Sequence, residues 1–221
     1  MKIDAIIFDM NGIIIDDELI HEEAFKEICK RHNIKITTKD YQKFCLGRTD
    51  EDGFKDTLKK YKNFNFEIKD LVKEKSKKYL EIIPNKIKSR FGVIELINKL
   101  SKKYRMALTS SSNYREIDMV LNHFKIKELF EVIVSAEDVK IGKPNPEPYI
   151  ITAKKLLINP SNCLVFEDSK NGVESAKAAG MYCIGIHNLS VYKKIGIKQN
   201  LEKANLEINS IKDIPKNLFS L

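Results

Sequence analysis

The residue with the clearest chemical potential is Asp9, which ends an apolar run over residues 3–8 and precedes a glycine, Gly12. A hydrophobic strand that leads into a glycine-marked turn is where an α/β protein exposes a reactive carboxylate. Such a carboxylate can attack a phosphoryl group and form an aspartyl phosphate. Gly12 would allow the backbone to turn sharply and approach a phosphate closely. The alternative for Asp9 is a structural role in a turn or helix cap.

Three later segments carry polar residues suited to the same chemistry. Ser110, with Thr109 as second choice, follows the run 106–108, and its hydroxyl can donate to phosphate oxygens, although a helix cap is the simpler account. Lys143, flanked by Gly and Pro, can neutralise charge between a carboxylate and a phosphoryl group. Glu167 and Asp168 end the run 163–166 and are suited to holding Mg²⁺. Other candidate substrate-binding residues are Ser111, Ser112 and Asn113.

The elements that must position these residues read as a parallel α/β sheet. Apolar runs over 3–8, 106–108, 132–134, 163–166 and 182–186 predict five strands, and residues 93–100 and 173–179 show helical spacing. Strands that alternate with helices indicate a Rossmann-like, mostly parallel sheet, whose ligand site lies beyond the carboxyl ends of the strands. Each polar segment falls at such an end.

Residues 17–84 form the exception, because they contain no strand-like run. Apolar residues instead repeat at helical spacing, as in Ile20, Ala24 and Ile28, and in Ile68, Leu71, Val72, Tyr79 and Ile83. We therefore expect an α/β core domain over 1–16 and 85–221, with a helical insertion over 17–84.

Composition excludes several classes of protein. The 221 residues are 43% hydrophobic and 32% charged, which is typical of a globular protein. The net charge of +8 comes from dispersed lysines, so nucleic acid is not an expected partner. The cluster of lysines over residues 73–78 is interpreted as a solvated helix face. There is no apolar stretch of roughly 20 residues and no signal peptide pattern, so we expect no membrane partner and a cytoplasmic location. A monomer is expected, and the scattered cysteines predict neither zinc nor disulfides.

The four segments together resemble the motifs of the haloacid dehalogenase (HAD) superfamily of phosphoryl-transfer enzymes. The run ending in Asp9-Met10-Asn11-Gly12 resembles motif I, the Ser110 segment motif II, Gly-Lys143-Pro-Asn-Pro motif III, and the Glu167-Asp168 segment motif IV. The resemblance covers essentially the whole chain, and it implies that the insertion is the small helical cap of this superfamily. It also implies a Mg²⁺ ion held by the Asp9 carboxylate, the Asn11 carbonyl and Asp168, with Glu167 bound directly or through water.

The predicted cap is similar to that of β-phosphoglucomutase-like members. Gly47 and Arg48 lie in a turn, where the arginine could grip a second phosphate or a polar substrate group, and His21 could face the cleft. A surface charge and an ordinary helix residue are the alternatives for Arg48 and His21. A small cap generally closes over low-molecular-weight substrates. We expect a small phosphorylated metabolite such as a sugar phosphate, and the residues do not separate phosphatase from mutase.

Asn11 departs from the motif, which usually carries aspartate here as the general acid/base. An amide cannot take this role, and general acid–base catalysis is typically worth about 10²–10⁴-fold in rate. A deliberate substitution and a natural divergence both explain Asn11, and the first is favoured because the other catalytic positions are intact. The alternative function is a non-catalytic phosphometabolite-binding pseudoenzyme. Metal-free dehalogenase and phosphonoacetaldehyde hydrolase chemistry fit the residues less well.

Overall fold

A six-stranded sheet organises the computed structural model, which describes residues 2–62, 65–188, 192, 196, 199–215 and 217–219. Its strand order is β3-β2-β1-β4-β5-β6, and neighbouring strands pair in parallel. The strands are β1 (Ala5–Phe8), β2 (Arg105–Thr109), β3 (Val132–Val134), β4 (Cys163–Glu167), β5 (Tyr182–Ile186) and β6 (Leu206–Ile208). The Rossmann-like α/β fold and its five expected strands are confirmed. The edge strand β6 was not expected.

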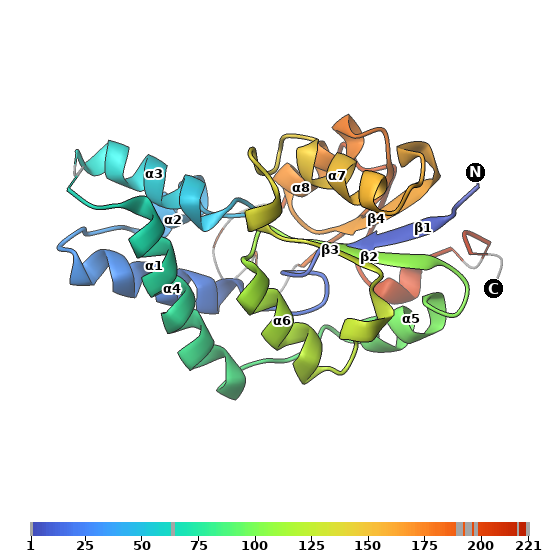
Figure 1. Ribbon diagram of the computed structural model, residues 1–221, viewed down its shortest axis with the longest axis horizontal. Helices are drawn as coiled ribbons and strands as arrows, with labels where there is room; N and C mark the ends of the chain where they lie inside the picture. Colours follow the sequence, from blue (N-terminus) through green and yellow to red (C-terminus); the bar gives the residue numbers. More distant parts are fainter. Residues whose placement is uncertain are drawn as a thin grey trace.

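Helices cover both faces of the sheet (Figure 1). Alternate residues of β1 enter two different cores: Ile6 and Phe8 pack with α5 (Val93–Leu100) and α6 (Tyr114–His123), whereas Ala5 and Ile7 pack with α7 (Glu147–Lys155) and α8 (Lys170–Ala178). Because β1 is fully buried on both faces, its sequence is a continuous apolar run rather than an alternating one. Short 3₁₀ helices lie at Ile83–Asn85, Lys127–Leu129, Ala136–Asp138, Pro160–Asn162 and Ile211–Asp213.

The first four helices after β1 lie together at the left of Figure 1. They are α1 (Glu18–Arg31), α2 (Thr38–Phe44), α3 (Asp50–Tyr61) and α4 (Ile68–Ile82). They share a hydrophobic cluster of their own, in which the rings of Phe25 and Phe54 stack with centroids 4.1 Å apart. This segment is helical as expected, while the exact limits of a separate cap domain stay a prediction.

One expectation about the helical segment is wrong. The cluster over 73–78 is not uniformly solvated, because the Lys75 side chain is only 1% exposed. Lys75 occupies the apolar stripe of α4, four residues after Leu71 and four before Tyr79, and all three side chains are buried. Among the described residues, every helix is too short or too polar to cross a bilayer.

Candidate active site

The candidate site lies at the carboxyl ends of the three central strands β2, β1 and β4. Phe8 pairs in register with Leu108 on one side and Phe166 on the other, so Asp9 follows the middle strand between Thr109 and Glu167. The Asp9 backbone N–H donates to the Phe166 carbonyl at 3.0 Å. The sheet therefore brings together residues that are more than 150 positions apart in the sequence.

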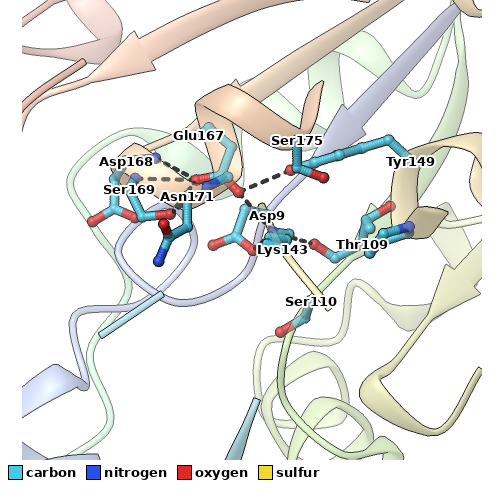
Figure 2. A network of polar contacts seen from close by, with 12 residues as sticks. Asp9, Thr109, Ser110, Lys143, Tyr149, Glu167, Asp168, Ser169, Asn171 and Ser175 are labelled. Carbon is cyan, nitrogen blue, oxygen red and sulfur yellow. Dashed lines mark hydrogen bonds and ion pairs between the residues drawn. The ribbon is translucent and has the colours of Figure 1, made fainter. Parts of the chain in front are cut away.

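Lys143 connects the ends of all three strands. Its Nζ donates to Asp9 Oδ1 at 2.7 Å, to Glu167 Oε1 at 2.6 Å and to the Thr109 carbonyl at 3.2 Å. Figure 2 shows its ammonium group among these residues. The side chain is 3% exposed, so these contacts are protected from solvent and fix the position of the positive charge.

Glu167 has both carboxylate oxygens fully engaged by the protein. Oε1 accepts from Lys143 and from the Tyr149 hydroxyl at 2.9 Å. Oε2 accepts from the backbone N–H groups of Asp168 and Ser169 and from the Ser169 hydroxyl, at 3.0–3.1 Å. This bonding makes Glu167 the anchor of Lys143 and of the start of α8 (Figure 2).

Asp9, Glu167 and Asp168 can each bring one oxygen within 4.8 Å of the others, as a metal site requires. Burial raises the pKa of Asp9 to about 7, and the Lys143 ammonium opposes this effect. Burial also raises the pKa of Asp168 well above its usual range, and the charges of Glu167 and Asp9 add to the shift. A cation between them would favour the charged carboxylates, so this donor set fits Mg²⁺.

Gly12 has the backbone that its position requires. Its φ is +78°, and a Cβ atom would lie 2.0 Å from Asp168 Oδ2, so a side chain cannot coexist with that carboxylate. The glycine thus lets the turn after β1 pass directly beside Asp168.

We expect Gly12→Ala to raise the Mg²⁺ concentration needed for half-maximal activity by about tenfold or more, because Asp168 must move. Gly92→Ala is the matched control: its φ is +77°, and no atom of the described residues lies within 4 Å of the added Cβ. It carries the backbone strain of roughly 1–2 kcal/mol without the collision. Mg²⁺ titrations of activity and thermal melts of both variants test this, and equal Mg²⁺ requirements would contradict it.

Asn11 sits in a network that suits an amide. Its Oδ1 accepts from the hydroxyls of Ser110 and Ser112, at 3.1 and 3.0 Å. Its Nδ2 lies 2.9 and 3.1 Å from the two carboxylate oxygens of Asp17, to which it donates. Nδ2 also lies 3.0 Å from the His21 ring. Donors therefore surround the amide oxygen, and a buried carboxylate accepts from the amide nitrogen.

A cavity opens above these residues, between the sheet and the helices α1–α4. The predicted site residues that line it are Asp9, Asn11, Gly12, His21, Gly47, Arg48, Ser111, Ser112, Lys143 and Asp168. Ser110 and Glu167 are not among its lining residues, but Ser110 donates to Asn11 and Glu167 accepts from Lys143. Asn113 lies apart: it caps α6 and donates to Ser76 Oγ on α4 at 3.0 Å.

The loop before α3 closes one side of the cavity. Gly47 has a φ of +67°, and an added Cβ would lie 3.0 Å from the Ser169 side chain. Asn171 on α8 donates to the Leu46 carbonyl at 3.3 Å. Arg48 does not extend across the cavity, because its guanidinium bonds Asp56 at 2.8 Å and the Phe44 carbonyl at 2.9 Å.

The sequence reasoning missed several residues that line the cavity on its helical side. They are Glu18, Tyr41, Asp50 and Lys75. Lys75 left a signal, since a lysine on an otherwise apolar stripe indicates a buried charge with a partner. Glu18 and Asp50 could not be recognised in the sequence, because the first turn of a helix is commonly acidic.

The fold and this site define a phosphoryl-transfer class of α/β protein, in which an aspartate, a lysine and a further carboxylate meet at the end of a parallel sheet. A family model described as haloacid dehalogenase-like hydrolase matches residues 6–186. The chain belongs to this family, as its motifs led us to expect.

Individual relatives agree with the family assignment. A phosphorylated carbohydrates phosphatase of Thermotoga maritima is 32% identical over 80% of this chain and 82% of the relative. A β-phosphoglucomutase of Bacillus subtilis is 28% identical over 82% of each chain. The crystal structure of β-phosphoglucomutase from Clostridium difficile superposes with a TM-score of 0.83 at 28% identity, covering 98% of this chain and 95% of that one.

Proposed function

We propose that the protein is a Mg²⁺-dependent phosphatase or phosphomutase of a small phosphorylated metabolite, in particular a sugar phosphate. The observation that carries this proposal is the meeting of Asp9, Lys143 and Asp168 in one buried cluster that borders a cavity. The relatives named as a carbohydrate phosphatase and a β-phosphoglucomutase support the choice of substrate class.

The Asp9 carboxylate, the Asn11 backbone carbonyl and Asp168 would hold the metal directly. Glu167 would act through water, since both of its oxygens already accept hydrogen bonds. Bound Mg²⁺ would supply positive charge at the phosphoryl oxygens.

In this proposal a carboxylate oxygen of Asp9 attacks phosphorus, and the bond to the leaving oxygen breaks, giving an aspartyl phosphate. Lys143 holds Asp9 in position and offsets the charge of the transferring group. Ser111 borders the cavity and could donate to phosphate oxygens, whereas the Ser112 hydroxyl already donates to Asn11. Asn11 cannot deliver a proton to the leaving oxygen, so we expect turnover to be slow.

We also propose that helices α1–α4 act as a cap domain, spanning about residues 17–84, that excludes water from the cavity. The contacts of the Leu46–Gly47 loop with Ser169 and Asn171 support a closed arrangement. A monomer in the cytoplasm is the assembly and location we propose.

A non-catalytic phosphometabolite-binding protein is the second candidate, and the one observation that favours it is Asn11. It predicts measurable affinity for sugar phosphates without release of phosphate under any metal condition.

A panel of sugar phosphates distinguishes the two candidates. With Mg²⁺ we expect slow release of inorganic phosphate or slow isomer formation, and a loss of about 10²-fold or more when EDTA removes the metal. Restoring excess Mg²⁺ to the same sample is the control. Turnover that is insensitive to EDTA would contradict the metal assignment, while binding without turnover would favour the second candidate.

A further inference from the structure

The helical side of the cavity carries an unusual arrangement of charges for a protein that handles phosphates. Its wall contains two carboxylates, those of Glu18 and Asp50, and the hydroxyl of Tyr41. The Tyr41 hydroxyl donates to Glu18 Oε1 at 2.8 Å, which orients that carboxylate. Glu18 and Asp50 therefore bring hydrogen-bond acceptors and negative charge to the same cavity that Asp9 lines.

The lysines and arginine among the described lining residues each have a carboxylate partner already. Lys75 Nζ lies 2.8 Å from Asp50 and 3.5 Å from Glu116, and its side chain is 1% exposed. Arg48 is paired with Asp56 at 2.8 Å. Lys143 is held between Asp9 and Glu167, where it serves the transferring phosphate.

A second phosphate would meet this wall unfavourably. A phosphate monoester carries a charge of about −1.5 to −2 at neutral pH. At the helical side of the cavity it would lie against Glu18 and Asp50, while Lys75 is already neutralised by Asp50 and Glu116. Juxtaposed like charges reduce affinity, whereas hydroxyl or ammonium groups can donate to the same carboxylates.

We propose that the cavity selects phosphate monoesters whose far end carries hydroxyl or amino groups, and that it discriminates against bisphosphates. This inference rests on the proposed function and favours its phosphatase form, because a mutase that works through a bisphosphate must hold two phosphates. The reaction is then hydrolysis: the ester P–O bond breaks, water supplies the oxygen and the proton, and the products are an alcohol and inorganic phosphate.

Equilibrium binding tests the selectivity without depending on turnover. Calorimetric titration of the Mg²⁺-loaded protein with glucose 6-phosphate and with glucose 1,6-bisphosphate gives two dissociation constants on one hexose scaffold. We expect the monophosphate to bind at least about tenfold more tightly. Tighter binding of the bisphosphate would overturn the inference.

Two variants test whether the acidic wall is responsible. Asp50→Asn removes a wall carboxylate and leaves Lys75 with Glu116 as its remaining carboxylate partner, so we expect the preference for the monophosphate to fall by about fivefold or more. Glu51→Gln removes the same charge from the same turn of α3 but lies outside the cavity lining, and should leave the preference unchanged. An equal preference in both variants would refute the assignment of Asp50.

Each preference is a ratio measured within one protein sample, so partial unfolding of a variant does not mimic the effect. Phosphate release is followed separately on the same samples. Absence of release from both esters would count against the proposed enzyme, whereas the ratio of dissociation constants would still decide the selectivity.

Discussion

Asp9→Asn is expected to reduce phosphoryl transfer by at least about 10³-fold, because an amide oxygen is not a competent nucleophile in place of the carboxylate. The replacement is nearly isosteric, and Lys143 retains its ion pair with Glu167 at 2.6 Å. The variant should therefore fold, and the loss should appear in turnover rather than in the yield of protein. Phosphate release with saturating Mg²⁺, together with a thermal melt, measures both.

Asp70→Asn is the matched control for Asp9→Asn. It makes the same chemical change on α4, at a side chain that is 70% exposed and lies outside the cavity. We expect its turnover to equal that of the parent. If Asp9→Asn retained the parent rate, Asp9 would not be the nucleophile and the proposed mechanism would fall.

The sheet and its catalytic edge could be predicted because both are encoded locally. An apolar run followed at once by a polar residue marks a buried strand and its carboxyl end, as at Phe8-Asp9 and Phe166-Glu167. The strand β6 could not be recognised in this way. It contains one exposed residue, Glu207, between two apolar ones, and it is defined by its pairing with β5, about 20 residues earlier.

The partners of individual side chains could not be predicted, because they depend on how the elements pack against one another. Arg48 was expected to face substrate, but Asp56, on the next helix, binds its guanidinium. Asn113 was expected near a phosphate, yet it caps α6 and contacts Ser76 on α4. Asp56 and Ser76 each lie on another helix, and the sequence does not indicate which side chain of that helix becomes the partner.

Asn11 shows this limit most clearly. The sequence presents it as an isolated loss of a carboxylate, and a deliberate substitution was the favoured explanation. The structure places the buried carboxylate of Asp17 2.9 Å from its amide nitrogen. An aspartate at position 11 would face that carboxylate at the same distance, and one of the two would have to take up a proton. Because these surroundings match an amide, we expect natural divergence rather than a deliberate substitution, and the variants below test this expectation.

Restoring the usual motif with Asn11→Asp alone is therefore expected to be an incomplete repair. The new carboxylate can supply general acid–base catalysis, worth about 10²–10⁴-fold when correctly charged and placed. The substitution also removes the amide N–H that donates to Asp17, and it places a second negative charge beside that buried carboxylate. We expect a cost of about 2 kcal/mol, which lowers the Tm of a chain of this size by roughly 4–8 °C.

The exchanged variant Asn11→Asp/Asp17→Asn separates these effects. It keeps one carboxylate and one amide in the pair, but the amide donor is now at position 17. The new amide oxygen at position 17 can still accept from the Tyr79 hydroxyl, which contacts Asp17 in the parent protein. We expect it to recover most of the lost Tm and to exceed Asn11→Asp in turnover, while Asp17→Asn alone stays slow because no acid is present at position 11. Positive coupling in this double-mutant cycle would show that residues 11 and 17 form a matched pair. If Asn11→Asp alone gave the more stable and faster protein, the surroundings would suit a carboxylate at position 11, and a single recent substitution would be the better explanation of this asparagine.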